Sequence, residues 1–428
     1  MLNKHDKNFV KSQSRTAQSR GNNFGQRLID AAVNLFENPW TAALSAGVIY
    51  LLVSVQKGAI SHPTEVAYYN YLADAFLHGQ TWLRLIPPST HDLVFYGGKY
   101  FLYWAPFPAI TLLPVIAVFG VSVNDVIYTL IIASMNVGLI AVLLRSAERV
   151  EFILIGRKKR AIMVFFFAFG TVHFILAPLG KVWMTGQLFG FTCTILAYLA
   201  TFSLKGWKAW FFTGLALAAA MLTRTQMVFT GIFPLVYLFF REKPWNWRII
   251  VRNLIYAAMP LFIALGFYML YNNSRFQNPF DVGLAYQQMG SFIGSEFGKY
   301  GTFNIHYIPK NFYYHYFFYP FPMRDESFMG GSLFLLSPLF FAIFFVFRKP
   351  KPKYLIWALY LSILLTDIPI LMLIGTGWIQ FGPRYTLDFT VPLLLLVAIG
   401  IENWSSKVVL LLAGISVISY MVGFAYIG

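Results

Sequence analysis

Several polar side chains border the apolar stretches of this chain: Lys181, Gln187, Arg224, Arg384, Tyr385 and Asp388. A charge within a membrane-spanning helix costs about 2.5–3.5 kcal/mol to insert, so such residues are functional candidates. The forked guanidinium group of arginine matches phosphate oxygens. This set therefore predicts a cationic pocket for a phosphate group. The alternative for Arg384 and Asp388 is an ordinary ion pair within one helix, because they stand one turn apart.

Three carboxylates between residues 57 and 105 are candidates for a general base: Glu65, Asp74 and Asp92. Pro63 and Gly79 bracket a predicted surface helix of about four turns. On such a helix, Glu65 and Asp74 face opposite sides, so they cannot act as a pair. One carboxylate with several cations suits displacement of a phosphate, a leaving group that needs a cation more than an acid. The alternative for Glu65 is an acid that interacts with the helix dipole.

The composition is that of a membrane protein. The 428 residues are 58% hydrophobic and only 12% charged, whereas about a quarter of a soluble domain is charged. The net charge of +16 lies in short loops, which favours contact with anionic lipid and argues against nucleic acid. The single cysteine, Cys193, excludes a disulfide within the chain and a thiolate metal site. The histidine spacing contains no zinc motif, so we expect no metal and no cofactor.

Apolar stretches that approach or reach 20 residues predict an all-α polytopic membrane protein with about eleven spanning helices. The positive-inside rule places the basic N-terminal tail and the Arg157-Lys158-Lys159-Arg160 loop in the cytoplasm. Both lie inside only if the short, proline-containing segment 106–120 is re-entrant or interfacial. The C-terminus and the face that carries the candidate residues then lie outside the cytoplasm.

We expect two parts: a disordered basic cytoplasmic tail, 1–38, and a single transmembrane domain, 39–428. The domain includes two external loops, 57–105 and 273–330. The second loop is rich in Tyr, Phe and Pro, a composition that suits the headgroup zone of a membrane. It is either a passive interfacial belt or a lid over a lipid-linked ligand.

These segments resemble polytopic glycosyltransferases of the C fold (GT-C), whose members include protein mannosyltransferases and the aminoarabinose transferase of lipid A. Thr64-Glu65, followed by Tyr68 and Gly79, resembles the acidic opening of that family's first external loop. DLVFYGGKYFLYWAPFPAITLLP resembles its Gly-Lys-Tyr and proline-rich continuation, and GWIQFGPRYTLDFTVPLLLL resembles a later stretch of bacterial members. The chain departs from the family at Thr64, where the usual catalytic aspartate is missing.

The resemblance implies transfer of a sugar from a polyprenyl-phosphate donor to an extracytoplasmic glycan or lipid acceptor, at an external site in a bacterial plasma membrane. Glu65 would be the base and Arg384 a phosphate ligand, with Lys181 or Arg224 assisting. Asp388 and Asp367 would orient Arg384. The expected partners are the lipid-linked donor, a glycan or glycolipid acceptor, and membrane lipids. The alternatives are a transporter or flippase of lipid-linked saccharides, a polysaccharide polymerase or ligase, and a non-catalytic scaffold.

Overall fold

The computed structural model describes residues 27, 29–288, 294–348, 351–377 and 380–427. Most of the tail expected at 1–38 lies outside these residues. Residues 29–37 are helical, and the Glu37 carboxylate accepts hydrogen bonds from Arg145 at 2.9 Å and Arg160 at 2.8 Å. Helical structure among the described residues is thus present on the N-terminal side of residue 38.

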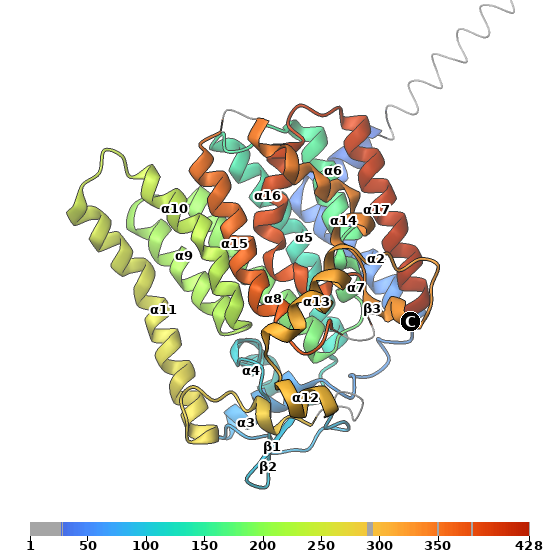
Figure 1. Ribbon diagram of the computed structural model, residues 1–428, viewed down its shortest axis with the longest axis vertical. Coiled ribbons are helices and arrows are strands. Elements are labelled where there is room, and N and C mark those ends of the chain that lie inside the picture. The colour runs from blue at the N-terminus through green and yellow to red at the C-terminus, as the bar shows by residue number, and fades with distance from the viewer. Residues whose placement is uncertain (1–26, 28, 289–293, 349–350, 378–379, 428) are drawn as a thin grey trace, which may run out of the picture.

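A helical bundle makes up most of the protein (Figure 1). Its long helices are α2 (Pro39–Gln56), α5 (Asp125–Arg149), α8 (Val182–Ser203), α11 (Trp247–Phe276), α15 (Lys353–Leu371) and α17 (Ser406–Ile427). Its shorter helices are α6 (Gly156–Phe169), α7 (Val172–Leu176), α9 (Gly206–Met221), α10 (Ile232–Arg241), α14 (Leu333–Leu336), α16 (Thr390–Gly400) and the 3-10 helices η1 (Thr225–Gly231), η6 (Pro338–Arg348) and η7 (Arg384–Phe389). In the described residues, six helices are long and apolar enough to cross a membrane. The chain is an integral membrane protein.

Capping residues explain where the long helices begin. The Asn38 side chain accepts the backbone N–H of Trp40, and proline occupies the first position of α2. Asn124 caps α5 in the same way. This helix has an acid in its first turn and Arg149 in its last, and both charges interact favourably with the helix dipole. Asn246 caps α11. Each cap satisfies a backbone donor that the helix itself leaves free.

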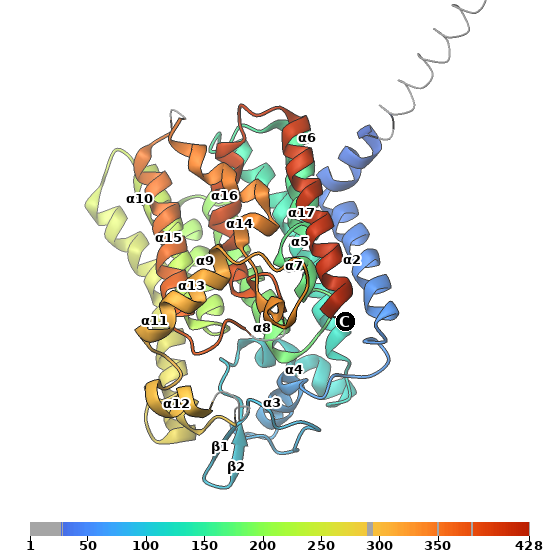
Figure 2. The same cartoon turned by 45° about the vertical axis from the view of Figure 1, so that its right-hand side comes forward.

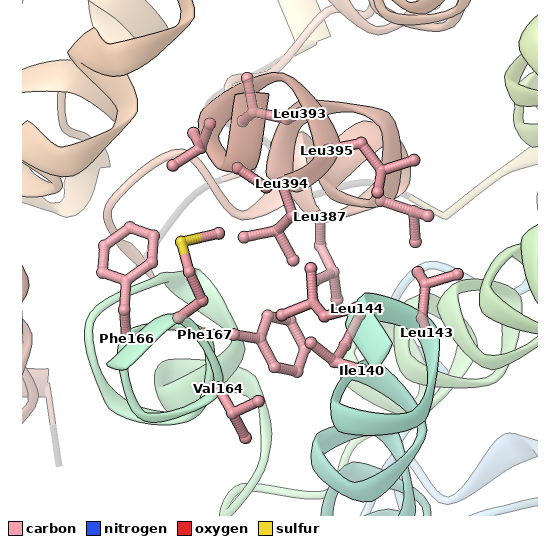
Figure 3. Close-up of a cluster of buried hydrophobic side chains, with 14 of the residues drawn as sticks. Ile140, Leu143, Leu144, Val164, Phe166, Phe167, Leu387, Leu393, Leu394 and Leu395 are labelled. Atoms are coloured by element: carbon pink, nitrogen blue, oxygen red, sulfur yellow. The ribbon is translucent and has the colours of Figure 1, made fainter. Parts of the chain in front are cut away.

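An apolar core joins α5, α6 and the η7–α16 segment (Figure 3). The side chains of Ile140, Phe167, Leu387 and Leu394 are at most 1% exposed within it. Lipid tails are as apolar as these side chains, so close packing, and not transfer out of water, stabilises the contact. The core holds η7 in place, and η7 carries Arg384 and Asp388.

One end of the bundle is covered by a layer that we call the cap, residues 57–105 with 277–288 and 294–307 (Figure 1). Its elements are α3 (Tyr68–Leu77), β1 (Val94–Tyr96), β2 (Lys99–Phe101), η2 (Leu284–Tyr286), α12 (Gly294–Tyr300) and η4 (Ile305–Tyr307). Strands β1 and β2 form an antiparallel hairpin in which Val94 pairs with Phe101. Its turn uses Gly97 and Gly98 at φ 55° and 75°, a conformation that glycine adopts without strain.

The helix expected from Pro63 to Gly79 is shorter than predicted, because α3 begins only at Tyr68. The backbone N–H and hydroxyl of Thr64 donate to the Asp125 carboxylate at 2.8 and 2.5 Å. These bonds to the start of α5 hold the preceding residues in a turn, outside the helix.

Helix α4 (Phe107–Phe119) corresponds to the segment 106–120. It lies beside α3 at the cap end of the bundle (Figure 2), and the N–H of Phe107 donates to the carbonyl of Leu222 at 2.9 Å. With 13 residues it is shorter than the roughly 20 residues of a spanning helix. Its placement as re-entrant or interfacial stays a prediction.

The segment expected as the external loop 273–330 begins inside α11, which continues to Phe276. It then adds α13 (Ile308–Tyr316), η5 (Asp325–Phe328) and β3 (Met329–Gly330), which pairs in parallel with β4 (Gln380–Phe381). The Asn311 amide donates to the carbonyls of Leu371 and Leu373 at 2.9 and 2.7 Å. These contacts attach α13 to α15, so α13 forms part of a wall of the bundle.

Candidate active site

A fully buried carboxylate, Asp388, gathers side chains from two other elements. Its Oδ2 accepts hydrogen bonds from Arg224 Nε and Gln226 Nε2, both at 2.8 Å. The Gln187 amide of α8 donates to Oδ1 at 3.3 Å and to the carbonyl of Arg384 at 3.0 Å. Asp388 therefore pairs with Arg224, and the alternative ion pair with Arg384 is wrong. In a 3-10 helix, with three residues per turn, residues four apart do not share a face.

Arg384 is only 6% exposed, yet it has no ion pair with any carboxylate among the described residues. Its terminal nitrogen donates to the Tyr385 hydroxyl at 3.3 Å, and its Nε has no hydrogen-bond partner in the same part of the chain. The guanidinium groups of Arg384 and Arg224 lie 4.9 and 5.3 Å from the centre of the Tyr385 ring. Two cations with little exposure thus share one aromatic ring, and among the described residues only Arg224 has a carboxylate within ion-pair distance. A buried, uncompensated cation is costly unless an anion joins it.

Asp92 brings a carboxylate from the cap toward this pair. Its two oxygens accept hydrogen bonds from the Trp183 indole and the Gln287 amide, both at 3.1 Å. Its φ of 64° lies in the left-handed region that aspartate tolerates better than most residues. Burial raises the pKa of the Asp92 carboxyl, and the charge of Arg384 is among the effects that oppose the rise. Asp92 is thus oriented by two donors and lies within electrostatic reach of Arg384.

Two tyrosines complete the surroundings. Burial raises the pKa of the Tyr103 hydroxyl well above its ordinary value, and the charges of Asp92, Arg224 and Arg384 also act on this group. Tyr69 of α3 points its hydroxyl at Gly186 of α8, where an added Cβ would lie 2.7 Å from the oxygen. The Tyr69 hydroxyl is buried without a hydrogen-bond partner among the described residues.

The remaining sequence candidates lie elsewhere. Glu65 is exposed in the turn before α3, and its side chain has no hydrogen bond or ion pair within the part of the chain that the structure describes. Both oxygens of Asp74 accept hydrogen bonds from Arg84 at 3.0 Å. The Lys181 side chain is exposed, while its backbone N–H donates to Asp125 at 3.0 Å. Asp367 accepts from the Tyr316 hydroxyl at 2.6 Å and does not contact Arg384.

Sequence reasoning missed Gln226, Tyr103 and Asp125. Gln226 offered a signal, as a second polar side chain two residues after Arg224 in an apolar region. Asp125 offered none, because an acid in the first turn of a helix is ordinary. No group of three His, Cys, Asp or Glu suited to a metal ion occurs in the described ranges.

Two adjoining apolar grooves run along α11. The first, of about 390 Å³, lies between α4, α9 and α11 and is lined by residues that include Phe107, Leu222, Ala264 and Phe267. The second, of about 420 Å³, lies between α3, α4 and α11 and also includes Phe267. Leu222, which lines the first groove, is two residues before Arg224.

Comparisons with known proteins give similar solved structures only. No family model and no curated protein matches the chain. The solved structure of ArnT from Cupriavidus metallidurans, bound to undecaprenyl phosphate, is similar, with a TM-score of 0.50 and 13% identity over 85% of this chain and 60% of ArnT. The apo oligosaccharyltransferase of Archaeoglobus fulgidus has a TM-score of 0.44 and 12% identity over 90% of this chain and 55% of that one.

This chain therefore spans 60% of the length of ArnT. At 13% identity the likeness concerns the fold alone. The fold class predicted from the sequence is confirmed: this is an all-α polytopic membrane protein with the GT-C fold. The described residues contain six helices of spanning length, so the expected number of about eleven spans stays a prediction.

Proposed function

We propose that this protein is a membrane glycosyltransferase that moves a sugar from a polyprenyl-phosphate donor to a glycan or lipid acceptor. The observation that carries the proposal is the arginine pair, in which buried Arg384 has no ion pair with a carboxylate of the described residues and lies beside Arg224 and Tyr385. The phosphate of a lipid-linked sugar would supply the missing negative charge. The similarity in fold to ArnT, solved with undecaprenyl phosphate, supports this ligand class.

The grooves along α11 suit the lipid part of such a donor. They are apolar, they adjoin each other at Phe267, and the first is lined by Leu222, two residues before Arg224. An isoprenoid chain in the grooves would place its phosphate near Arg224 and Arg384. When the bond between the anomeric carbon and the phosphate oxygen breaks, the phosphate gains negative charge, which two preorganised guanidinium groups stabilise.

Within this mechanism we assign the base to Asp92, in preference to Glu65. Asp92 is held by Trp183 and Gln287, and burial raises the pKa of its carboxyl, which makes it a stronger base than an ordinary aspartate. It would take the proton of the acceptor hydroxyl as that oxygen bonds to the anomeric carbon, opposite the departing phosphate. Glu65 is exposed and has no partner in the described segments to orient it.

The threonine at the family's usual acidic position fits this assignment. Thr64 donates two hydrogen bonds to the carboxylate of Asp125. An aspartate at position 64 would place a second carboxylate against Asp125, and two like charges at that distance repel. We infer that position 64 anchors the cap in this protein and that the base lies elsewhere in the cap.

We place the cap outside the cytoplasm and the N-terminal tail inside, in a bacterial plasma membrane. The basic loops support this orientation, because they lie together at one end of the bundle. Lys351 donates to the Glu151 carbonyl at 3.2 Å and pairs with Glu402 at 3.3 Å. Loops from three parts of the chain thus meet at the end of the bundle opposite the cap (Figure 2). Cationic loops are retained in the cytoplasm.

The test uses full-length protein in lipid nanodiscs, supplied with undecaprenyl-phosphate hexoses and a mixed acceptor extract. The readout is release of free undecaprenyl phosphate. We expect release by the wild type and losses of at least about 100-fold in Asp92→Asn and Arg384→Ala. Glu65→Gln is the matched control and should retain activity.

Each other outcome is informative. Activity lost in Glu65→Gln and kept in Asp92→Asn would return the base to Glu65. Lipid moved between leaflets without release would favour the flippase alternative. Sugar chains that grow on one lipid would favour the polymerase. No release by folded wild-type protein from any donor would overturn the proposal.

A further inference from the structure

A second group of buried polar side chains adjoins Arg384. The group consists of three residues that are at most 2% exposed: His315 of α13, Thr376 of the loop after α15, and Gln380 of β4. The carbonyl of Thr376 accepts a hydrogen bond from Gln380 Nε2 at 2.6 Å and lies 3.5 Å from His315 Nε2. Two side chains, those of Gln380 and His315, thus meet at the backbone carbonyl of Thr376.

Gly377 connects this group to Arg384. A Cβ added at Gly377 would lie 2.4 Å from Gln380 Oε1 and 2.8 Å from Arg384 Nε. These two polar atoms therefore face the same point, which only a glycine leaves open. The Tyr385 ring lies 6.4 Å from the His315 ring and 4.9 Å from the Arg384 guanidinium, so the group borders the arginine pair.

Four atoms of this group have no hydrogen-bond partner in the described residues: His315 Nδ1, Thr376 Oγ1, Gln380 Oε1 and Arg384 Nε. Buried polar atoms lose their bonds to water, so native proteins leave few of them unpaired. Two of the four, Gln380 Oε1 and Arg384 Nε, lie 2.4 and 2.8 Å from the same point beside Gly377, and the other two belong to residues that adjoin them, which indicates a site that a polar ligand completes. Arg384 Nε can only donate, Gln380 Oε1 can only accept, and the Thr376 hydroxyl can do both.

We propose that His315, Thr376, Gln380 and Arg384 form the pocket that receives the sugar ring of the donor. The hydroxyl groups of a sugar each donate and accept, which matches a pocket of mixed donors and acceptors. Arg384 belongs to both parts of the site, with its terminal nitrogens toward the phosphate and its Nε toward a sugar hydroxyl. This inference rests on the proposed function, because it assumes that a lipid-linked sugar phosphate binds at the arginine pair.

The test compares two kinds of probe on full-length protein in nanodiscs: undecaprenyl phosphate without sugar, and undecaprenyl phosphate that carries mannose, glucose or galactose. Thr376→Val keeps the shape and removes the hydroxyl, and Gln380→Leu removes the amide. Both should bind the sugar-free lipid as the wild type does. Both should bind the preferred hexose-linked lipid about tenfold more weakly, the effect of one lost hydrogen bond.

The matched control is Thr194→Val, because the Thr194 hydroxyl is equally buried but donates to the Gly190 carbonyl within α8 at 3.2 Å. It should change neither affinity. Wild-type affinity of both pocket variants for every hexose-linked probe would overturn the inference and indicate that water fills the pocket. The inference would also be overturned if the wild type bound no hexose-linked lipid better than the sugar-free one. No binding of either kind of probe would refute the proposed function itself.

Discussion

Arg384 and Asp388 are separated by a single turn of chain, and their surroundings give them opposite roles. Asp388 accepts hydrogen bonds from Arg224, Gln226 and Gln187, so its charge and its oxygens are occupied by the protein. The guanidinium of Arg384 packs against Tyr385 and has no carboxylate among the described residues. Arg224 is thus structural as well as cationic, while Arg384 retains its charge for a ligand.

The pH dependence of transfer tests the residue-scale assignment of the base. Asp92 must be ionised to accept a proton, and burial raises its pKa above the ordinary value of 3.8. We expect kcat/KM to fall as the pH drops through this raised pKa, at a higher pH than an ordinary aspartate would give. Measurement of the pH–rate profile checks this, and Glu65→Gln should leave the profile unchanged. A profile that shifts in Glu65→Gln would contradict the assignment.

The raised pKa of Asp92 also affects the stability of the fold. Folded Asp92 holds its proton more tightly than the unfolded chain does. Its contribution to the free energy of unfolding is therefore present at low pH and is lost as the pH rises through the folded pKa. Asp92→Asn should remove this part of the pH dependence.

At the scale of elements, close helix contact shapes the lipid groove. Gly214 of α9 lies against α11, where an added Cβ would be 2.1 Å from the Ala257 carbonyl oxygen. Small residues allow membrane helices to approach each other closely. The α9–α11 crossing therefore depends on Gly214, and both helices line the first groove.

Gly214→Ala should push α9 away from α11. We expect a loss of about 1–3 kcal/mol in the free energy of unfolding, the usual cost of overpacking, and weaker binding of undecaprenyl phosphate. Thermal unfolding in nanodiscs and a lipid-binding assay measure these effects. The matched control is Gly266→Ala on α11, where the added Cβ meets no atom within 4 Å. Equal behaviour of the two variants would show that the crossing tolerates a methyl group.

At the scale of the whole molecule, the site lies where the bundle, the cap and the α11 grooves meet. The cap supplies Asp92 and Tyr103, the bundle supplies the arginine pair, and Arg275 of α11 donates to the Leu102 carbonyl of the cap at 2.6 Å. This arrangement lets an apolar chain remain among helices while its polar end faces the cap.

Filling the groove should distinguish lipid recognition from chemistry. Ala264→Trp places a large ring in the first groove, which Ala264 lines. We expect KM for an undecaprenyl-linked donor to rise about tenfold or more, because the ring displaces several isoprenoid contacts. A donor with a two-isoprene chain should be affected much less. Leu410→Trp, at a 47% exposed position on α17, is the control, and equal effects on both donors would refute the groove assignment.

The orientation of the whole molecule is testable by labelling. The single cysteine, Cys193, is buried, so Cys193→Ala provides a background without thiols. In that background, Phe95→Cys on the cap should react with a membrane-impermeant maleimide on intact cells. Lys158→Cys, in the first turn of α6, should react only after the cells are opened. The reverse pattern would place the cap in the cytoplasm.

The amino-acid sequence by itself determined the membrane class and the residues that deserve attention. Charged and polar side chains are costly near lipid in any fold, so Gln187, Arg224, Arg384 and Asp388 stand out before any contact is known. Apolar length and loop charge likewise predict helices without reference to their packing. These signals are local, and the sequence displays them directly.

Only the tertiary structure decided which of these residues act together. Asp388 pairs with Arg224 across 164 positions, and Trp183 holds Asp92 across 91. Thr64 bonds to Asp125 across 61 positions, which shortens α3 and leaves Glu65 exposed in a turn. Local periodicity cannot set such pairings, because they depend on how distant helices pack. The same packing leaves Arg384 without an ion pair to any carboxylate of the described residues.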